Sequence, residues 1–341
     1  MGLVRHFLLC ASHGDTLGAV NPVRIAVIGA GSFGRNHLRV LRNSPNARLV
    51  AVVDTDRDRA EAASAEFGCP AMEIGELKGI VDAAVVAVPT SAHADAGCTL
   101  LEAGIDVLVE KPIASGAAAG RRLVDAARAH CRILQVGHLE RFNPAVLALQ
   151  RIRTTPLFFE IHRMSVFTPR SLDVDVVLDL MIHDVDIVLS LVGCPPEEIR
   201  AAGLPVLTDR VDIANVRLAF PTGCIANLTA SRVSTERIRK LRVFQPSQYI
   251  TLDYQRQDLL TFTVNEGDGS AGKEIHCEAV PVEKSEPLKL ELEAFLTSVA
   301  TRSRPPVTGE EGLAALEVAL GILAKIEEHS ERVRAQLVPR V

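Results

Sequence analysis

The stretch RIAVIGAGSFGRNH, residues 24–37, decides the fold of this chain. It opens with a short β-branched run that predicts a buried strand, and a helical stretch follows it to about residue 43. Between the two, Gly29, Gly31 and Gly34 have Gly-x-Gly-x-x-Gly spacing. In such a unit the first glycine permits a tight turn, the second lets backbone approach a pyrophosphate, and the third allows close helix packing. The stretch predicts a dinucleotide-binding unit with phosphates at the helix N-terminus.

The second predicted strand, residues 48–54, ends in Asp54, 20 residues after Gly34. A carboxylate at this position accepts hydrogen bonds from both ribose hydroxyls of NAD and repels the 2′-phosphate of NADP, so we expect NAD as the cofactor. The alternative is that the three glycines serve only a tight turn. The residues expected to contact the cofactor are Gly29, Gly31, Ser32, Phe33, Gly34, Asp54, Pro89, Thr90, His93, Glu110 and Lys111.

The first part of the chain alternates between predicted strands and helices. Apolar runs at 83–88, 106–111 and 132–137 continue the series of strands, and helical stretches at 57–68, 91–104 and 117–130 separate them. Strands that are apolar throughout and alternate with helices are typical of a parallel sheet covered on both faces. We therefore predict an α/β protein whose N-terminal domain is a Rossmann domain, a doubly wound parallel sheet.

Beyond residue 143 the pattern changes. Helices at 143–153 and about 177–192 precede longer, more polar strand-like runs at 211–220, 224–233, 238–245 and 249–255. Consecutive strands with short connections predict a large, mainly antiparallel open sheet, and two amphipathic helices, 288–303 and 309–333, follow. We expect a disordered extension over 1–21, an NAD-binding domain over 22–142, and a substrate-binding and oligomerisation α/β domain over 143–335.

Composition and charge narrow the classes of function. A net charge of −5 without a concentrated basic face gives no support for nucleic-acid binding. No apolar run approaches the ~20 residues needed to span a bilayer, so no membrane partner is expected. The seven cysteines are scattered without a Cys-x-x-Cys pair, which is typical of reduced thiols in a cytoplasmic protein and predicts no metal site.

Two polar segments follow the predicted strand ends. Glu110, Lys111 and Pro112 stand at the carboxyl end of a parallel strand, where doubly wound sheets bind their ligands, so Lys111 should face the cofactor crevice. Taken alone, Lys111 is more typical of a surface lysine at a strand exit, which is a common position. His93, after another strand end, is either a structural residue at a helix N-terminus or a substrate contact.

The segment VVLDLMIHDVDIVLSLVG, residues 176–193, carries Asp179, His183 and Asp186 within an otherwise apolar helix. Residues spaced i, i+4 and i+7 fall on one stripe of a helix. A helix that is apolar on its other sides is largely buried, and ionisable groups within it need partners or a cleft. The alternative is a solvated seam on a surface helix.

Four motifs follow one another along the chain: the glycine motif, AVPTSAH at 87–93, Glu-Lys-Pro and Asp-x-x-x-His. With these motifs in this order, the chain resembles the Gfo/Idh/MocA oxidoreductases from about residue 23 to about residue 328. The resemblance implies a Rossmann domain and a C-terminal α/β domain whose open sheet often mediates oligomerisation. It also implies that Lys111 and His183 line the site where a sugar or cyclitol hydroxyl meets the nicotinamide. Asp179 would contact the substrate or position the histidine.

The chain departs from the broad family pattern because no glycine directly precedes Asp179 and because the sequence has no tryptophan. With VGHLERFNPAV at 136–146 and the segment 231–254, it resembles the UDP-N-acetylglucosamine 3-dehydrogenase branch. Members of that branch oxidise the sugar 3-hydroxyl to a ketone before amination for lipid A. The resemblance implies a cytoplasmic homodimer or homotetramer formed through the C-terminal sheet. The residues expected to bind substrate, each alternatively structural, are Arg141, Asn143, Arg163, Arg170 and Arg232.

The expected chemistry is alcohol oxidation. Hydride leaves the carbinol carbon for the nicotinamide while a base takes the hydroxyl proton, a role that suits an imidazole of near-neutral pKa such as His183. Lys111 would stabilise the alkoxide or relay its proton, Asp179 would orient the imidazole, and Asp186 would be structural. The residues do not decide whether Lys111 or His183 is the immediate acceptor. The alternatives are an inositol or free-sugar dehydrogenase and a non-catalytic NAD-binding regulator, against which the presence of Lys111 and His183 argues.

Overall fold

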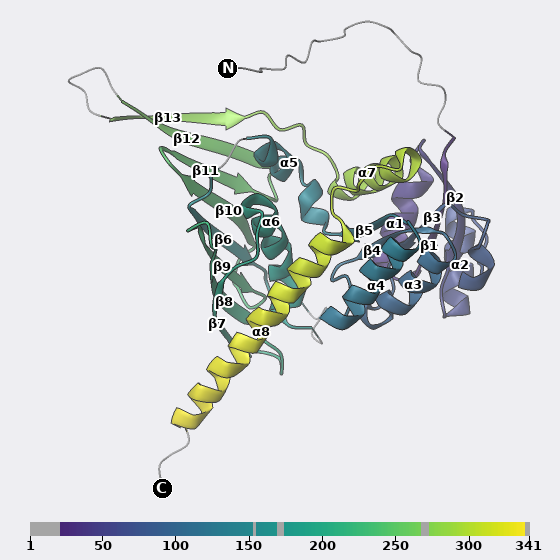
Figure 1. The fold of residues 1–341 in the computed structure, drawn as a ribbon, viewed down its shortest axis with the longest axis horizontal. Helices are drawn as coiled ribbons and strands as arrows, with labels where there is room; N and C mark the ends of the chain where they lie inside the picture. The colour runs from purple at the N-terminus through teal and green to yellow at the C-terminus, as the bar shows by residue number, and fades with distance from the viewer. Residues whose placement is uncertain (1–20, 153–154, 169–173, 267–272, 338–341) are drawn as a thin grey trace, which may run out of the picture.

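The computed structural model describes residues 21–152, 155–168, 174–266 and 273–337 (Figure 1). The first part of the described chain forms a five-stranded parallel sheet in the order β2-β1-β3-β4-β5, which confirms the doubly wound α/β prediction. Its elements are β1 (Val23–Ile28), α1 (Ser32–Arg42), β2 (Ala47–Val53), α2 (Arg57–Phe67), β3 (Ala83–Val86), α3 (His93–Glu102), β4 (Asp106–Glu110), α4 (Ala117–Ala129) and β5 (Leu134–Gly137). Short 3₁₀ turns lie at η1 (Ile74–Leu77), η2 (Thr90–Ala92) and η3 (Leu139–Phe142).

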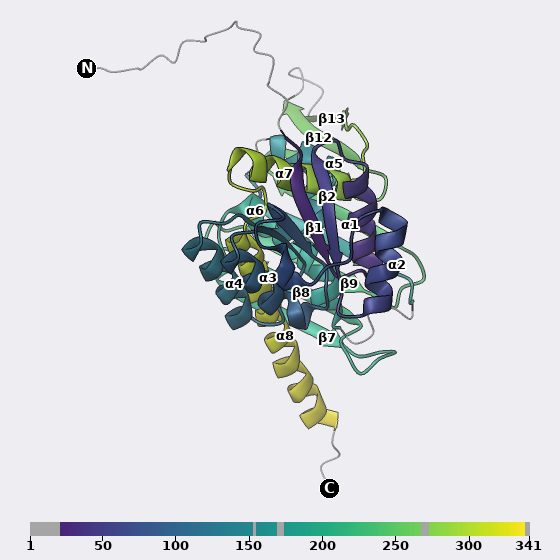
Figure 2. The same cartoon turned by 90° about the vertical axis from the view of Figure 1, so that its right-hand side faces the viewer.

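Both faces of this parallel sheet are covered, as its continuous apolar strands require. On one face Val27 of β1 and Leu108 of β4 pack in one cluster with residues of α1 and α2 and with Phe295 of α7 (Pro287–Thr301). On the other face Ile28 and Val109 pack with residues of α3, α4 and the first turns of α8 (Gly309–Leu337). The two C-terminal helices therefore return to the N-terminal sheet (Figures 1 and 2).

The second sheet has eight strands within the described ranges, in the order β13-β12-β11-β10-β6-β9-β8-β7. Every neighbouring pair is antiparallel except β6 with β9, which confirms the mainly antiparallel prediction. The strands are β6 (Phe158–Met164), β7 (Glu198–Leu204), β8 (Ile213–Ala219), β9 (Ile225–Ser231), β10 (Ile238–Gln245), β11 (Gln248–Asp253), β12 (Asp258–Glu266) and β13 (Lys273–Val280). Sequence analysis did not predict β6, β7, β12 and β13. β13 is exposed along most of its length, so its sequence lacks the alternation of apolar and polar residues that predicts a half-buried strand.

One face of this second sheet is packed and the other carries exposed aromatic rings. Residues of α5 (Pro144–Arg151), α6 (Ile182–Val192) and α8 share a core with the strands. The opposite face carries a row of aromatic rings, Phe158, Phe244, Tyr249 and Phe262. The ring centroids of successive members are 5.6, 4.8 and 5.2 Å apart. Phe244 is 37% exposed in the single chain. An aromatic row with solvent access is the kind of surface that a partner covers, and oligomerisation through this sheet stays a prediction.

Two sequence expectations concern segments rather than elements. Nearly all of the expected extension, residues 1–20, lies outside the described residues. The domain boundary at 142/143 stays a prediction, although α7 packs on the N-terminal sheet from beyond it. Within the described ranges, no helix has both the length and the apolar character needed to cross a membrane.

Candidate active site

The glycine loop between β1 and α1 has the shape that a dinucleotide needs. Gly29 has a φ of +99°, and a Cβ there would lie 2.5 Å from the carbonyl oxygen of Ala87. A Cβ on Gly34 would lie 1.7 Å from the carbonyl oxygen of Gly29. Gly31 precedes the first turn of α1 and has nothing within 4 Å of such a Cβ. Two glycines therefore allow close packing, and the third leaves open space where a pyrophosphate would meet the helix N-terminus.

A cavity of about 510 Å³ extends from this loop along the carboxyl ends of β1, β2 and β3. Asp54 lies on its wall and accepts hydrogen bonds from the backbone N–H groups of Ala30 at 2.7 Å and Asp56 at 2.8 Å. The Arg59 guanidinium donates to the same carboxylate at 2.9 Å. Burial opposes ionisation of Asp54, but the hydrogen bonds from Arg59, Asp56 and Ala30 outweigh it and lower its pKa. The loop, the cavity and an ionised Asp54 fit NAD.

Arg59 was not predicted as part of this site. It lies on α2, five residues after Asp54, and its side chain is 53% exposed at the cavity wall. In the structure Asp54 holds the guanidinium and neutralises it. The arginine is thus available to a 2′-phosphate only if the aspartate releases it.

The Asp54→Ser substitution should relax the preference for NAD over NADP by about tenfold or more, a change of roughly 1.4 kcal/mol in relative transition-state binding. Serine removes the charge that repels a 2′-phosphate and frees Arg59 to pair with it. The ratio of kcat/KM for the two cofactors measures the effect. Asp56→Ser is the matched control, because Asp56 is also 3.6 Å from Arg59 but caps α2. Equal efficiency with NADP in the unmodified protein would contradict the role given to Asp54.

A second cavity of about 230 Å³ lies at the ends of β3 and β4 and shares Ala87, Val88 and Pro89 with the first cavity. The fold brings together here several residues that sequence analysis singled out separately: Phe33, Pro89, Thr90, His93, Glu110, Lys111 and Asp179. The dinucleotide cavity is thus continuous with the space around Lys111. That is the place where the reactive end of a bound cofactor would meet a substrate.

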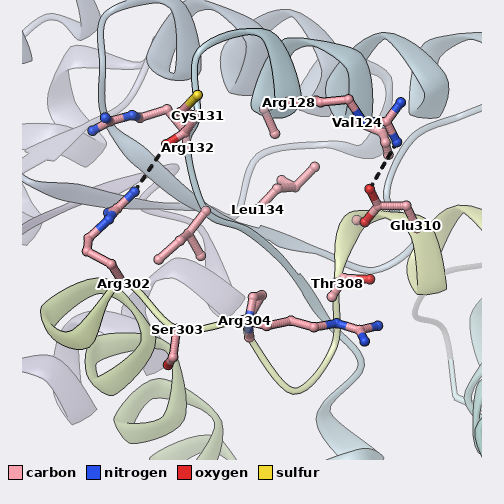
Figure 3. A pocket seen from close by; sticks show the side chains of 14 residues that line it. Val124, Arg128, Cys131, Arg132, Leu134, Arg302, Ser303, Arg304, Thr308 and Glu310 are labelled. Carbon is pink, nitrogen blue, oxygen red and sulfur yellow. Dashed lines mark hydrogen bonds and ion pairs between the residues drawn. The ribbon is translucent and has the colours of Figure 1, made fainter.

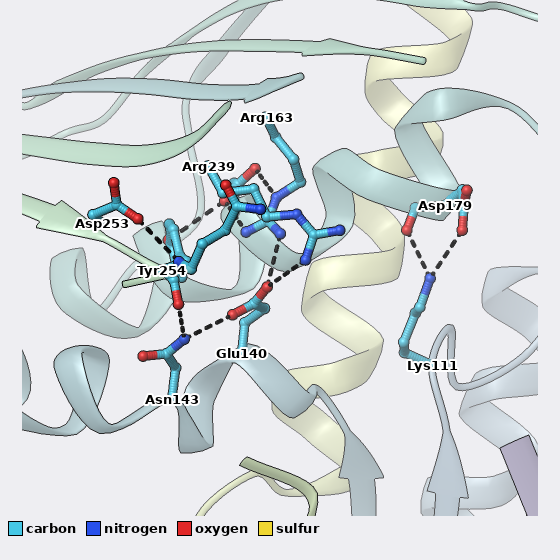
Figure 4. Close-up of polar contacts among 10 residues, drawn as sticks. Lys111, Glu140, Asn143, Arg163, Asp179, Arg239, Asp253 and Tyr254 are labelled. Carbon is cyan, nitrogen blue, oxygen red and sulfur yellow. Dashed lines mark hydrogen bonds and ion pairs between the residues drawn. The ribbon is translucent and has the colours of Figure 1, made fainter. Parts of the chain in front are cut away.

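Lys111 follows β4, and its Nζ donates to the backbone carbonyl of Asp179 at 2.7 Å and lies 3.4 Å from Oδ1 of the same residue (Figure 4). Asp179 belongs to a π-helical turn, η4 (Val177–Met181), that leads into α6. A π-helical turn holds more residues than an α-helical turn, so the i, i+4 stripe expected from the sequence is displaced here. In this structure Asp179 pairs with Lys111. The expectation that Asp179 contacts the substrate or positions His183 stays a prediction.

His183 lies about one turn after Asp179, in the first turn of α6. Its Nδ1 is buried, and no described residue gives it a hydrogen-bond partner. Its ring lies edge-on to the ring of His138, with centroids 6.3 Å apart. Burial lowers the pKa of His183 well below its ordinary value, and the cations Lys111 and Arg163 lower it further. The near-neutral pKa expected from the sequence therefore does not hold for the site without substrate, and the imidazole is neutral at pH 7.

His138 is a neighbour of His183 that sequence analysis did not single out. It is fully buried, and both of its ring nitrogens lack a partner within the described part of the chain. Burial, followed by the charges of Arg141 and Lys111, lowers its pKa to about 3. His138 therefore adds a second neutral imidazole beside His183.

His93 has a structural placement. Its Nδ1 lies 2.9 Å from the carbonyl oxygen of Pro112, and its Nε2 lies 3.0 Å from that of Val88. Burial lowers its pKa, and a neutral ring donates to one of these two carbonyls while it packs between the exit of β3 and the loop after β4. Both nitrogens face backbone, which supports the structural alternative over a substrate contact.

The cations expected to bind a diphosphate are mostly engaged inside the protein. Arg163, 1% exposed, donates to both carboxylate oxygens of Asp184 at 2.8 and 2.7 Å and to Glu140 at 2.9 Å (Figure 4). Its guanidinium also lies over the Tyr254 ring, 4.9 Å from the centroid. These contacts give Arg163 a structural role. Its buried N–H groups are not exposed to bind a diphosphate. Its assignment as a substrate contact is therefore not supported.

The other expected substrate residues also have internal partners. Arg141 lies 3.4 Å from Asp186, a carboxyl whose pKa is raised to about 7 by burial. Asn143 caps α5 and donates to the Tyr254 carbonyl at 3.0 Å. Arg232 donates to the carbonyl of Val174. Arg170 lies outside the described residues. The substrate roles of these residues stay predictions.

Arg239 on β10 is a better-placed cation that sequence analysis missed. Its side chain is 32% exposed and lies 3.6 Å from Glu140, next to the buried Arg163 (Figure 4). Burial and the charge of Arg163 lower its pKa. A guanidinium destabilised by a neighbouring cation gains more from an incoming anion than an isolated one does.

A further cavity of about 540 Å³ lies at the start of β5 (Figure 3). Lys111, by contrast, follows the carboxyl end of β4. Four arginines line it, but each already has a partner. Arg128 lies 3.4 Å from Glu310, Arg304 lies 3.2 Å from Glu311, and Arg302 pairs with Asp106. Arg132 donates to the carbonyls of His130 and Gly104. This cavity contains none of the residues that sequence analysis singled out.

Comparisons with known proteins agree with this geometry. Residues 23–138 match the Gfo/Idh/MocA model of an oxidoreductase family with an NAD-binding Rossmann fold, and residues 152–245 match the C-terminal domain of the same family. A UDP-N-acetylglucosamine 3-dehydrogenase from Acidithiobacillus ferrooxidans is 33% identical over 91% of this chain and 99% of its own length. An inositol 2-dehydrogenase from Rhizobium meliloti is 26% identical over 90% of this chain and 97% of its own.

Solved structures show the same likeness. A structure of the Acidithiobacillus enzyme has a TM-score of 0.84 at 32% identity and covers 90% of this chain and 98% of that one. An NAD-binding oxidoreductase from Klebsiella pneumoniae has a TM-score of 0.80 over 90% of this chain and 97% of its own. At 19% identity, that second likeness is one of fold alone.

Proposed function

We propose, from the premise that this chain belongs to the Gfo/Idh/MocA family of NAD-binding oxidoreductases, that it oxidises a sugar hydroxyl of a nucleotide sugar to a ketone. The proposed substrate is UDP-N-acetylglucosamine, oxidised at its 3-hydroxyl. The observation that carries the proposal is the position of Lys111. Lys111 lines a cavity that shares residues with the dinucleotide cavity, its Nζ is held by Asp179, and its charge acts on His183.

Different residues of this chain would bind the cofactor and stabilise the reacting oxygen in such an oxidation. The α1 N-terminus at Gly31 would hold the pyrophosphate, and Asp54 the adenosine ribose. When bound, NAD supplies the hydride acceptor. The Lys111 ammonium stabilises the alkoxide that develops as the hydroxyl proton leaves, and Asp179 fixes the position of that ammonium.

We assign the proton to His183. Its imidazole is neutral and has an unpartnered Nδ1, whereas the Lys111 ammonium already donates and has no lone pair. In the site without substrate the cations Lys111 and Arg163 hold the pKa of His183 down. Negative charge on the reacting oxygen opposes that effect and raises the basicity of the imidazole during the step itself.

The choice of a nucleotide sugar is supported by the 33%-identical relative that carries that activity in its name and matches nearly the whole chain. A uridine diphosphate also needs a cation, and we place that role on Arg239, the partly exposed guanidinium beside Glu140. The buried Arg163–Asp184 pair beneath it keeps this part of the sheet rigid.

A substrate panel tests the proposal. NADH formation is followed with UDP-N-acetylglucosamine, other nucleotide sugars, glucose and myo-inositol at equal concentrations. We expect kcat/KM for UDP-N-acetylglucosamine to exceed that for the free sugars by about 10²-fold or more, because the free sugars leave the cations of the site unpaired. A preference for myo-inositol would instead make the chain an inositol dehydrogenase. The absence of turnover with every sugar, despite NAD binding, would favour a regulator.

We further propose that the chain acts in the cytoplasm as a homo-oligomer and that its product is aminated for lipid A. The exposed aromatic row on the second sheet, Phe158 to Phe262, supports the oligomer. The name and coverage of the Acidithiobacillus relative support a 3-keto nucleotide sugar as the product on which such an amination would act.

A further inference from the structure

A buried group of polar side chains lies directly behind Lys111, between the parallel sheet and helices α1 and α7. Glu110 is paired in register with Gly137, and Leu108 with Gln135. Alternate residues of a strand share a face, and Leu108 packs in the cluster that contains residues of α1 and α7. The side chains of Glu110 and Gln135 therefore point to the face that these two helices cover.

Each helix adds one titratable residue to this space. His37 of α1 is fully buried, and its Nε2 lies 2.7 Å from Oε1 of Glu110. Glu110 also accepts the backbone N–H of Lys111 through Oε2, at 3.3 Å. Glu291 of α7 is fully buried, and its backbone carbonyl accepts Nε2 of Gln135 at 3.3 Å. We call Glu291, Glu110, His37 and Gln135 the α7 polar cluster.

The carboxyl group of Glu291 has no partner of its own. Neither of its oxygens has a hydrogen-bond partner among the described residues, and no cation there pairs with it. His37 Nδ1 and Gln135 Oε1 are unpartnered too. A lone buried carboxylate is among the most unfavourable groups in a protein, and such a group stays protonated instead. Burial, and next the charge of Glu110, raise the pKa of Glu291 well above its ordinary value.

The charge in the cluster lies on Glu110. Burial opposes its ionisation, but His37 and Lys111 outweigh burial and lower its pKa. A protonated carboxyl has one O–H donor. His37 Nδ1 has no partner within hydrogen-bond distance among the residues that the structure describes, so the acceptors that remain for that donor are the carboxylate of Glu110 and Oε1 of Gln135. Of these, the carboxylate gains the most from a donor because it carries the charge.

We propose that Glu291 is a positioning residue for Lys111: a neutral carboxylic acid that donates its hydrogen bond to the Glu110–His37 pair and keeps Glu110 anionic beneath the lysine. Glu110 in turn holds the backbone of Lys111. The catalytic meaning of this inference rests on the role given to Lys111 in the proposed function. The protonation state of Glu291 does not, and it can be measured on the protein without substrate.

Infrared spectroscopy tests the protonation state directly. The difference spectrum of wild type minus Glu291→Gln at neutral pH should show one protonated-carboxyl C=O band that the variant lacks. Other buried carboxyls with a raised pKa, such as Asp186, are present in both proteins and cancel. Glu293→Gln is the matched control, because Glu293 lies two residues on in α7 and accepts from Ser44 and Asn46 at 2.6 Å. A spectrum that lacks the protonated band and shows a lost carboxylate instead would overturn the proposal.

The pH dependence of folding gives a second test that needs no catalysis. Because the pKa of Glu291 is raised in the folded state, the folded protein keeps a proton that the unfolded chain loses above about pH 4.3. As pH rises above about 4.3, the proton held by Glu291 in the folded state therefore lowers the stability of the wild type progressively. The ratio of the folding equilibrium constant of Glu291→Gln to that of the wild type should increase by up to about tenfold per pH unit. The same ratio for Glu293→Gln should not change with pH. A gain that shrinks as pH rises would contradict a neutral Glu291.

The positioning role has its own readout in the pH profile of kcat/KM. Glu291→Gln keeps a neutral donor and should keep the wild-type profile. Glu291→Leu removes the donor, so the pKa of Glu110 should rise and the acid limb should move up by about one unit, as loss of a hydrogen bond to a charged group implies. A folded leucine variant with the wild-type profile would leave Glu291 a purely structural residue. If the leucine variant does not fold, the infrared and unfolding results on the glutamine variant still decide the protonation state on which the proposal depends.

Discussion

Lys111→Met should lower turnover by about 10²–10⁴-fold while leaving NAD affinity nearly unchanged. Methionine keeps the length and apolar stem of the lysine but removes the ammonium that we propose stabilises the reacting oxygen. We expect cofactor binding to rest mainly on Gly29, Gly31, Gly34 and Asp54, which lie around the first cavity and the glycine loop. Steady-state kcat and a fluorescence titration with NADH on the same preparation separate the two effects. Lys289→Met, an exposed lysine on α7, is the control and should behave as wild type.

The effect of His183→Ala should be of the same size, and the double variant should lose little more than either single one. Residues that act as one unit in a transition state are strongly non-additive. Additive losses would mean that Lys111 and His183 act at separate steps. Near-normal turnover in His183→Ala would remove the histidine from the chemistry and leave Lys111 or another group as the proton acceptor.

Arg163→Met should produce the largest loss of stability, about 3–5 kcal/mol in the free energy of unfolding. The arginine is 1% exposed and is the partner of Asp184 and Glu140. Its removal leaves the buried Asp184 without its cation and leaves Glu140 only the more distant Arg239, at 3.6 Å. Denaturant unfolding measures the change.

Arg242→Met is the matched control for that prediction. Arg242 of β10 pairs with Glu160 of β6 at 2.9 Å, but both side chains of this pair are at least about a third exposed. A surface ion pair contributes about 0–1 kcal/mol, so this variant should be nearly as stable as wild type. Similar losses in the two variants would show that volume, not the buried charge, accounts for the effect at Arg163.

The parts of the site that the sequence could predict are those with a local cause. The glycine loop is such a part, because Gly29 and Gly34 are required by contacts made within one strand–turn–helix unit or with the neighbouring strand end. Lys111 is another, because the carboxyl end of a parallel strand points to the ligand crevice whatever the rest of the chain does. The alternation of strands and helices predicted the doubly wound sheet for the same reason.

The parts that could not be predicted depend on distant segments. Asp179 pairs with Lys111, 68 residues away, and the π-helical turn that places it leaves no mark in the apolar pattern. Asp184, next to His183 in sequence, pairs with Arg163 on a strand of the second sheet. Glu291 joins the site only because α7 returns to the N-terminal sheet near the end of the chain. Each of these contacts depends on the relative placement of elements, which periodicity does not encode.

Transfer of deuterium from the substrate to the cofactor tests the central claim most directly. The protein is incubated with NAD and UDP-N-acetylglucosamine that carries deuterium at carbon 3 of the sugar, and the reduced cofactor is analysed by mass spectrometry. The account predicts one deuterium in each NADH formed, an equal amount of the 3-keto nucleotide sugar, and neither product from Lys111→Met. NADH that forms without deuterium would place the oxidation at another carbon, and no NADH at all would contradict the function proposed for this site.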